Sequence, residues 1–424
     1  MENSSGLKIA VVGAGVAGIV AAHVLQRSHD ITLYEKNDYI GGHTHTILIE
    51  DGVDAGTPVD TGFIVCNDKT YPNFLKFLDQ LGVARQKSTM SFSYYDPSRN
   101  FFYGSLNADT FFIQRRSILN PSFWRMILGI LSFNQGTPRL LHQGRLAGFT
   151  MGEYLKAHRY NRFFIEDYLL PITAAVWSAP DVKMLDFPME TFARFFENHG
   201  LFSIIRHPQW YTITGGSHTY VKAFLNGFRG RVLQGVPVRG IRREDNSVFI
   251  KADGLEEERY DRVVVACHAD EAFEMLCDPS EEEAALLNVW TYSKNRTVLH
   301  TDTAVLPPEK KIWLSWNYLR LSDVTSGSPV VLTYNMNRLQ SLTTRNTYCV
   351  TLNPHRTFEE GRIIRDMVYT HPRFSFDTIA TQPRLREISG RRNTYYCGSY
   401  HGYGFHEDGV RSALNVAASF GMRL

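Results

Sequence analysis

The sequence has few cysteines, no long apolar run and almost no net charge. Its five cysteines among 424 residues are scattered, odd in number and never in a C-x-x-C pair, which argues against a disulfide framework and a zinc site. We therefore expect reducing, cytoplasmic surroundings. No apolar run reaches the roughly 18 residues of a membrane span. No basic stretch followed by an apolar core opens the chain, so we expect no secretory signal.

Charge is nearly balanced, with 45 Lys and Arg against 43 Asp and Glu and a formal net charge of +2. Such a balance creates no strong field, so we expect a small-molecule substrate and no nucleic acid as a partner. Repeats and low-complexity segments are absent. A chain of this length exceeds one typical hydrophobic core, so we expect two connected domains, and the composition indicates no particular oligomeric state.

Glycine provides the first positive signal. Gly13, Gly15 and Gly18 form a G-x-G-x-x-G pattern after Lys8–Val12, an apolar run typical of a buried strand, and before a helix-forming run. In a dinucleotide-binding fold the first glycine allows a tight turn and the second lets the backbone approach the pyrophosphate. The third lets the helix lie against the strand.

An acid completes this pattern. A second apolar run, Ile31–Tyr34, ends at Glu35, 22 residues after Gly13. A dinucleotide-binding fold places the carboxylate that binds the ribose hydroxyls at this distance, and an acid there disfavours a 2'-phosphate. The sequence therefore predicts a dinucleotide site. The alternative is a helix that only packs closely on a strand.

The rest of the chain predicts a discontinuous arrangement. We expect a hairpin turn at Glu50–Gly52, mostly helix from 71 to 206, and a closing helix at 408–421. Strand-like runs are expected at 236–241, 247–251, 260–266 and 394–400, and, in the region from 299 to 350, at 311–318, 329–334 and 347–352. The predicted division is a nucleotide-binding domain in 1–70, 216–290 and 391–424, a mainly helical substrate or cap region in 71–215, and a substrate domain with an antiparallel sheet in 291–390.

Five motifs spread over the whole chain carry a resemblance to known proteins. They are the glycine turn with its acid, Gly41-Gly42, the Val238-x-x-Ile241 pair, the run 260–266, and Cys397-Gly-Ser399 with the later Glu407-Asp-Gly-Val-x-Ser412. This layout resembles the flavin amine oxidase, phytoene desaturase and protoporphyrinogen oxidase superfamily. More narrowly, RHPQWYTITGGSHTYV, WLSWNY, TYNMNRLQ, TLNP and GSYHGYGFHEDGVRSAL are similar to bacterial predicted NAD/FAD-binding proteins related to the flavoprotein-like amino-terminal half of plant cyclopropane fatty acid synthases.

The resemblance implies an α/β fold with a Rossmann-like FAD-binding domain, three-layered with a parallel sheet. The discontinuous substrate domain would then consist of an antiparallel sheet plus helices. FAD is the implied cofactor. The implied cofactor-binding residues are Gly13, Gly15, Ala17, Gly18, Glu35, Lys36, Gly41, Gly42, His43, Thr44, Gly62, Val238, Gly398, Glu407, Asp408, Gly409 and Val410.

Two of these positions raise particular expectations. His43 stands where superfamily members commonly have Arg, so a permanently charged group is missing beside the phosphates. A helix that begins near 408–410 would direct free N–H groups at the end of the flavin ring system where negative charge gathers on reduction. The alternative is an ordinary closing helix in which Glu407 and Asp408 are helix-start acids.

Beyond the cofactor, the sequence offers only candidates. His401, Tyr403 and His406 are candidate catalytic proton donors or acceptors, with a structural role as the alternative. Phe63, Trp210 and Tyr211 are candidates for the substrate wall, with aromatic core packing as the alternative.

Four polar positions, one of them already named, support weaker hypotheses. Asp60 fits a hydrogen-bonded structural acid better than a catalytic one. His43 and His45 lack a third ligand, so we expect no metal. Lys294 is a poor match for the lysine that promotes reaction with oxygen in related amine oxidases.

The sequence thus predicts an FAD-dependent oxidoreductase that moves a hydride between the flavin and a hydrophobic substrate, a fatty acyl or other lipid chain, by desaturation or double-bond isomerisation. The alternatives are a flavin amine oxidase and a non-catalytic flavin-bound lipid carrier or partner subunit of a lipid-modifying enzyme. Residues 115–133 fit either a core helix, which is favoured, or an interfacial helix in peripheral contact with a membrane.

Overall fold

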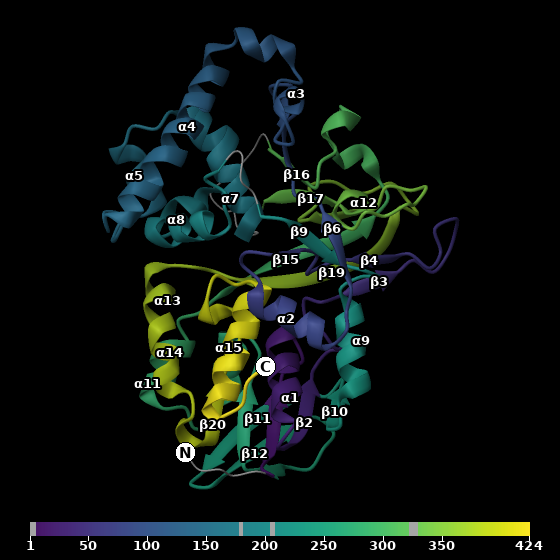
Figure 1. The fold of residues 1–424 in the computed structure, drawn as a ribbon, viewed down its shortest axis with the longest axis vertical. Coiled ribbons are helices and arrows are strands. Elements are labelled where there is room, and N and C mark those ends of the chain that lie inside the picture. Colours follow the sequence, from purple (N-terminus) through teal and green to yellow (C-terminus); the bar gives the residue numbers. More distant parts are fainter. Residues whose placement is uncertain (1–5, 178–180, 204–207, 322–329) are drawn as a thin grey trace.

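The computed structural model describes residues 6–177, 181–203, 208–321 and 330–424. Arg206 and His207, which open one of the motifs quoted above, lie outside the described residues. The nucleotide-binding domain and the substrate domain are stacked along the long axis of the molecule, with the helical region at the far end of the substrate domain (Figure 1).

A five-stranded parallel sheet forms the centre of the nucleotide-binding domain. Its strands, in spatial order, are β10 (Arg231–Gln234), β2 (Asp30–Glu35), β1 (Lys8–Val12), β14 (Arg262–Val265) and β20 (Thr394–Tyr396). Every neighbouring pair is parallel. The inner strands are apolar at successive positions because both faces of a parallel sheet are covered. The predicted parallel sheet is confirmed, and it includes a strand from near the end of the chain.

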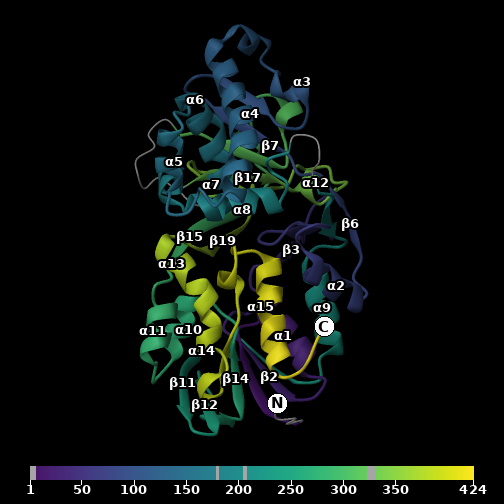
Figure 2. The same ribbon diagram turned by 60° about the vertical axis from the view of Figure 1, so that its left-hand side comes forward.

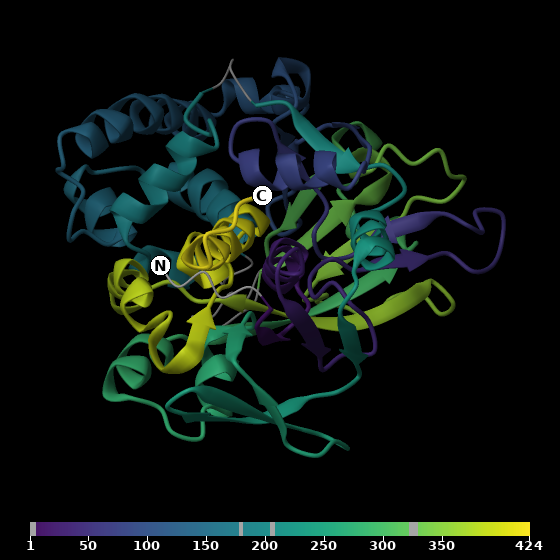
Figure 3. The ribbon, with the colours of Figure 1, turned by 60° about the horizontal axis from the view of Figure 1, so that its bottom comes forward.

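Layers cover both faces of this sheet. Ile9 and Val11 face a helical layer that shares one core with them, and Ala10 and Val12 face the opposite layer. The helices are α1 (Val16–Leu25), α2 (Pro72–Gln80), α9 (His218–Gly227) and α15 (His406–Ser419). The opposite layer holds the antiparallel strands β11 (Val238–Glu244), β12 (Ser247–Ala252) and β13 (Glu258–Tyr260) with α10 (Ala269–Met275), α11 (Glu281–Leu287) and α14 (Leu385–Ile388). Figures 2 and 3 show α15 beside α1 in the helical layer.

The substrate domain is built on a seven-stranded sheet. Its spatial order is β19 (Ile363–Pro372), β15 (Tyr292–His300), β18 (Cys349–Leu352), β17 (Val331–Asn335), β16 (Trp316–Leu319), β7 (Phe92–Asp96) and β8 (Phe101–Gly104). All neighbours are antiparallel except β16 and β7, which are parallel.

Segment 71–215, expected to be mainly helical, therefore also supplies strands. β7 and β8 are short and rich in aromatic residues, and Tyr94 and Tyr103 are fully buried between the sheet and the helices. Two small sheets accompany them: β3 (Thr46–Leu48) with β4 (Pro58–Asp60), and β5 (Cys66–Asn67) with β9 (Trp210–Ile213) and β6 (Arg85–Ser88). The β3–β4 hairpin turns at the predicted Glu50–Gly52.

The helical region packs on the seven-stranded sheet through one apolar core. Its helices are α3 (Ala108–Phe111), α4 (Pro121–His142), α5 (Met151–Ala157), α6 (Arg162–Phe164), α7 (Leu170–Trp177) and α8 (Met189–Asn198). Of two further short helices, α12 (Met336–Leu339) lies in the substrate domain, and α13 (Phe376–Thr381) lies next to α14 beside the nucleotide-binding domain (Figure 1). In the part of the chain that the structure describes, no helix is both long and apolar enough to cross a membrane.

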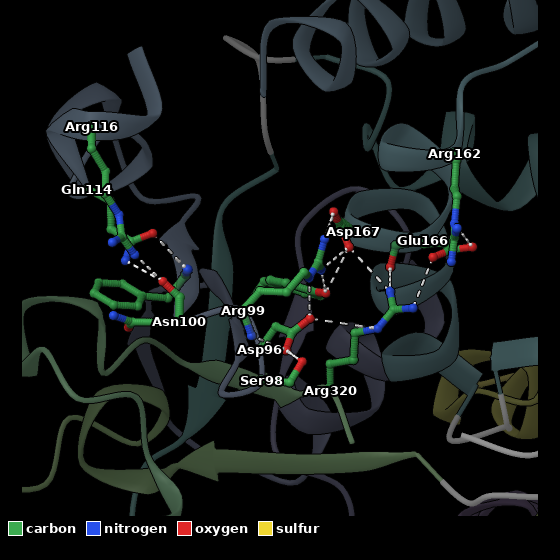
Figure 4. A network of polar contacts seen from close by, with 12 residues as sticks. Asp96, Ser98, Arg99, Asn100, Gln114, Arg116, Arg162, Glu166, Asp167 and Arg320 are labelled. Atoms are coloured by element: carbon green, nitrogen blue, oxygen red, sulfur yellow. Dashed lines mark hydrogen bonds and ion pairs between the residues drawn. The ribbon is translucent and has the colours of Figure 1, made fainter. Parts of the chain in front are cut away.

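A buried ion network fastens the helical region to this sheet (Figure 4). Asp167, in the π-helical turn Ile165–Leu169, accepts hydrogen bonds from Arg99 at 2.6 Å and from Arg320 at 3.2 Å. Arg99 also donates to Asp96 at the end of β7, at 2.6 Å. Because both aspartates are almost fully buried, each carboxylate needs these partners to remain charged in the interior.

Candidate active site

The glycine turn connects β1 to α1 at the carboxyl end of the parallel sheet. A Cβ atom on Gly18 would lie 1.8 Å from the carbonyl oxygen of Gly13, so only glycine lets α1 lie this close to the strand. Gly13 itself has a φ of +99°. The turn is built as the G-x-G-x-x-G pattern requires.

Gly15 has open space above it. A Cβ atom there would meet nothing within 4 Å, in contrast to Gly18. Helix α1 begins at this point without a side-chain cap and without an acid in its first turn, where Ala17 is buried. The first N–H groups of the helix have no intrahelical partner, and the positive end of the helix dipole faces the same space. This is the arrangement that holds a pyrophosphate.

Glu35 lies beside this turn at the end of β2 and is buried. Its Oε2 accepts a hydrogen bond from the Ala14 N–H at 2.9 Å, and its Oε1 accepts from the backbone N–H and the amide of Asn37 at 2.9 and 2.8 Å. Oε2 retains acceptor capacity that a ribose hydroxyl can use.

Val238 and Lys36 flank this carboxylate in different ways. The Val236 N–H donates to the Glu35 carbonyl at 2.8 Å, which places the start of β11, and so Val238, near the ribose position. Lys36 instead pairs with Glu271 of α10 at 2.5 Å. The Lys36 ammonium group therefore binds a carboxylate of the protein, although the resemblance implied a contact with the cofactor.

A second loop, residues 41–44, lies on the glycine turn. The Gly41 N–H donates to the Ala14 carbonyl at 2.9 Å, and the Tyr39 hydroxyl holds the Gly42 carbonyl at 3.1 Å. On its other side the segment 61–63 runs so close that a Cβ on Gly62 would lie 2.2 Å from the His43 carbonyl oxygen.

Helix α15 begins at His406, two residues before the predicted start. Its first turn packs on the first turn of α1, where a Cβ on Gly409 would lie 2.9 Å from the Cγ1 of Val16. Val410 is buried in the same core, and the Gly398 N–H donates to the Ser412 hydroxyl at 2.9 Å. Two helix N-termini therefore meet beside loop 41–44.

The acids at this helix start bind protein groups. Glu407 accepts from the Phe74 N–H at 2.9 Å and so caps α2, whereas Asp408 accepts from the Tyr403 N–H at 2.9 Å and pairs with Arg411 at 2.6 Å. Burial raises the pKa of both carboxyl groups. Asp408 therefore acts at the start of α15, as the alternative interpretation of the sequence expected, whereas Glu407 caps a different helix, α2. Only backbone groups of these two residues remain for a cofactor contact.

His406 is the predicted catalytic residue that reaches loop 41–44. Its Nε2 lies 3.0 Å from the Thr44 hydroxyl, and its ring stacks on Phe63 with 3.7 Å between ring centroids. The Tyr220 hydroxyl also contacts Thr44, at 2.5 Å. These contacts join four distant segments of the chain at one point.

Three residues that the sequence analysis did not select complete this corner. Tyr369 and His371 of β19 lie with ring centroids 5.2 and 5.4 Å from that of His43, and His268, which follows β14, lies 6.3 Å from it. The Tyr369 hydroxyl contacts the His45 Nδ1 at 2.9 Å. Tyr369 and His371 are two residues apart on a strand, so their side chains lie on the same face. This spacing is the signal by which the sequence could have indicated them.

The four histidines of this corner are half-buried, and their partial burial lowers the pKa of each. The pKa is lowered to about 4 for His268 and to about 3 for His371, and that of His406 lies well below its usual value. The Nε2 of His43 is buried without a hydrogen-bond partner among the described residues. We call this set, His43, Thr44, Phe63, His268, Tyr369, His371 and His406, the reaction corner.

Asp60 lies next to the reaction corner and is fully hydrogen-bonded. It accepts from the Thr46 hydroxyl at 2.5 Å, the Ser217 N–H at 2.8 Å and the Gln340 amide at 3.0 Å. Burial raises its pKa to about 6. These partners on three elements agree with its predicted role as a structural acid.

The two other catalytic candidates lie away from the reaction corner. His401 borders a pocket of about 330 Å³ between α14 and α15, together with Arg386 and Arg411. Tyr403 packs on Phe195 of α8 with 5.6 Å between ring centroids.

The remaining candidates are also separated from it. Trp210 and Tyr211 belong to β9, where they pair with β5 and β6. Lys294 is exposed on β15. Within the described residues, no group of three or more His, Cys, Asp or Glu side chains is arranged to hold a metal ion.

The fold is similar to that of several solved structures. The CLA-producing fatty acid isomerase from P. acnes matches with a TM-score of 0.68, 14% identity and 99% coverage of both chains. Putrescine oxidase bound to putrescine matches with a TM-score of 0.68, and cyclohexylamine oxidase from Brevibacterium oxydans IH-35A with 0.67, each at 14% identity over 98% of both chains.

One curated relative shares a short stretch. The flavin-dependent L-tryptophan oxidase RebO of Lentzea aerocolonigenes is 48% identical over 46 residues, which are 11% of this chain and 10% of that protein. The match therefore spans only a tenth of that protein's length.

The family described as flavin containing amine oxidoreductase matches residues 16–342, well over half of the chain. The uncapped α1 terminus, the open space over Gly15 and the partly free Glu35 carboxylate fit the dinucleotide half of the cofactor that this family uses. The chain therefore belongs to the flavin containing amine oxidoreductase family, and it is a flavin-dependent oxidoreductase whose cofactor is FAD.

Proposed function

We propose that this oxidoreductase moves a hydride between FAD and an apolar chain, a fatty acyl or other lipid chain. The observation that carries the proposal is the composition of the reaction corner, which includes no Lys, Arg, Asp or Glu side chain and whose four half-buried histidines have lowered pKa values. A site without these charged side chains favours a C–H bond in an apolar chain over an ionic substrate group.

Aromatic packing beside the corner adds support. Phe405, which precedes His406, stacks on Phe195 of α8 with ring centroids 5.0 Å apart, and Tyr403 packs on the same ring. Phe195 belongs to the apolar core of the helical region. A substrate that reached the corner from that side would meet aromatic rings, which pack well against hydrocarbon.

The nearby carboxylates are already engaged. Asp60, Glu407 and Asp408 are buried and accept hydrogen bonds from protein groups. An ammonium substrate would need a carboxylate or a similar group to replace its hydration. These three acids have no remaining role of that kind, which argues against an amine.

FAD, when bound, supplies the acceptor for a hydride. In this proposal the reaction corner would hold the substrate carbon near the cofactor, and Phe63 and the half-buried histidine rings would keep water from it. His406, held between Thr44 and Phe63, offers a neutral hydrogen-bonding group at the start of α15. If the hydride returns to a different carbon, the double bond moves and no oxidant is needed. In desaturation the neighbouring carbon loses a proton, and an acceptor such as oxygen must take the two electrons.

A fatty acid isomerase with the same fold at 14% identity is compatible with this proposal, as the fold accommodates such a substrate. Amine oxidation is the second candidate, because putrescine oxidase has the same fold and an L-tryptophan oxidase shares a short, closely similar stretch. A lipid carrier in which FAD is structural is the third.

Anaerobic mixing of the FAD-loaded protein with linoleic acid, and separately with putrescine and L-tryptophan, tests these candidates. We expect either loss of flavin absorbance with linoleic acid or a conjugated isomer among the lipid products, and no change with either amine. Loss of absorbance with an amine alone would overturn the proposal. Binding of linoleic acid without absorbance change or product would favour the carrier.

A further inference from the structure

An apolar projection stands at the far end of the helical region, opposite the nucleotide-binding domain (Figures 1 and 2). It is formed by the 3₁₀ turn Arg115–Leu119 and the first half of α4. Leu119 is 87% exposed, Leu128 63% and Trp124 44%, with Ile118 and Leu131 exposed beside them. We call the residues Ile118, Leu119, Trp124, Leu128 and Leu131 the apolar tip.

Helix α4 has two apolar faces. Phe123, Met126, Ile130 and Phe133 point into the core of the helical region. Trp124, Leu128 and Leu131 recur at spacings of four and three, so they line the opposite face. A helix needs one apolar face for its own core, so the second face is explained only by another apolar phase or partner.

The segment that carries this second face is rich in arginine, and Arg115 within it pairs with Asp109. Between Asp109 and Glu153 the chain holds five arginines, no lysine and no acid. The other 40 basic residues are outnumbered by 43 acidic ones, so the remainder of the chain is slightly negative. Arg116 follows the start of the turn and Arg125 lies next to Trp124, and both are exposed.

A second exposed apolar site provides a contrast. Leu48 and Val53, in and after β3, are 56% and 66% exposed. Glu50 and Asp51 separate them in the hairpin. An anionic surface would attract the apolar tip and repel this hairpin.

We propose that the apolar tip docks on the surface of an anionic lipid bilayer. Leucine and tryptophan side chains enter the boundary between headgroups and acyl chains while the arginines bind lipid phosphates, as in interfacial helices. Contact is peripheral, since the opposite face of α4 stays in the protein core. The proposal does not depend on the substrate class proposed above.

Co-sedimentation of the FAD-loaded protein with vesicles tests this docking. We expect binding to phosphatidylcholine vesicles that contain about 30% phosphatidylglycerol, and about tenfold weaker binding to pure phosphatidylcholine or at about 0.5 M salt. Equal binding to both kinds of vesicle, or none to either, would overturn the proposal.

Paired variants locate the contact. Leu119→Ser with Leu128→Ser should weaken binding about tenfold or more, because two exposed side chains lose their apolar contact with lipid. Arg116→Gln with Arg125→Gln should weaken it similarly and flatten the salt dependence. The control pair, Leu48→Ser with Val53→Ser, removes two exposed apolar side chains beside acids and should bind like the unchanged protein.

Two results would contradict this assignment. One is an equal loss of binding in the control pair. The other is sedimentation of the free protein as a dimer that the tip variants separate, which would identify a second copy as the occupant. Flavin absorbance and thermal unfolding should be unchanged in all three pairs, because the substituted side chains are exposed.

Discussion

The two ends of the FAD site are assembled in different ways. The nucleotide end comes mainly from residues 8–35, in which a strand, a glycine turn, a helix, a strand and an acid follow one another. The reaction corner joins loop 41–45, residues 61–63, β19 and the start of α15, so that Thr44 meets His406 across 362 positions of sequence. The first end can be recognised locally, whereas the second exists only in the folded chain.

Their chemistry differs as well. The nucleotide end offers backbone N–H groups and one carboxylate, which suit phosphate and ribose. The reaction corner offers neutral rings and hydroxyl groups, which suit a flat ring system and an apolar substrate. A change at the nucleotide end should therefore affect FAD binding, and a change in the reaction corner should affect the reaction.

The largest effect is expected at the nucleotide end, from Gly15→Asp. The open space should accept the side chain, and Asp is a good helix N-cap, so the FAD-free protein should unfold at the same temperature or slightly higher. Its negative charge would occupy the pyrophosphate position and raise the FAD dissociation constant by about 100-fold or more. Fluorescence titration measures this constant. Gly15→Ala is the control, and unchanged affinity in the Asp variant would contradict the placement of the pyrophosphate.

His406→Gln should separate binding from reaction. It replaces the ring that contacts Thr44 and Phe63, so we expect flavin reduction by substrate to slow by about 10- to 100-fold while FAD affinity changes less than about threefold. His401→Gln is the matched control on the pocket side of α15. Flavin reduction is measured by stopped-flow absorbance. Equal slowing in both variants would contradict a specific role of His406 in the reaction.

Acid should destabilise the reaction corner. Its histidines have folded pKa values below their usual 6.5, about 3 for His371 and about 4 for His268, so the unfolded chain binds more protons. Their contribution is fully present above pH 6.5 and is lost as pH falls toward 4, by about 1–3 kcal/mol in total. Urea unfolding at several pH values measures it. His371→Asn should reduce the loss of unfolding free energy at acid pH. The same pH dependence in this variant as in the unchanged protein would contradict a lowered pKa of His371.

The smallest effect is expected from Lys294→Met. The residue is exposed on β15 and outside the reaction corner. Reoxidation of the reduced protein by oxygen should change by less than about twofold, because an exposed side chain cannot fix a water at the flavin. A tenfold or greater decrease in the reoxidation rate, measured by mixing the reduced protein with oxygen, would indicate that Lys294 acts at the site.

Much of the nucleotide end could be predicted because backbone geometry fixes its residue types. Gly18 must be glycine where the helix meets the Gly13 carbonyl, and Glu35 must follow a strand beside the turn. The fold class, the superfamily and FAD followed from such motifs and are confirmed.

The reaction corner was only partly predicted. His406 and Phe63 were selected, but His268, Tyr369 and His371 were not, because no local pattern links β14 or β19 to loop 41–44. Glu407 carries a conspicuous acidic side chain, yet it caps α2, a helix more than 300 positions earlier. Pairings of this kind depend on register and packing between distant elements.

The sequence by itself determined the dinucleotide turn, the parallel sheet around it and the flavin class, because short-range geometry permits few residue types there. Only the tertiary structure decided which histidine reaches the reaction corner, which acids serve as caps and which face of α4 remains exposed. These properties arise from contacts between segments hundreds of residues apart, and burial changes the charge and hydrogen bonding of each group after the chain has folded.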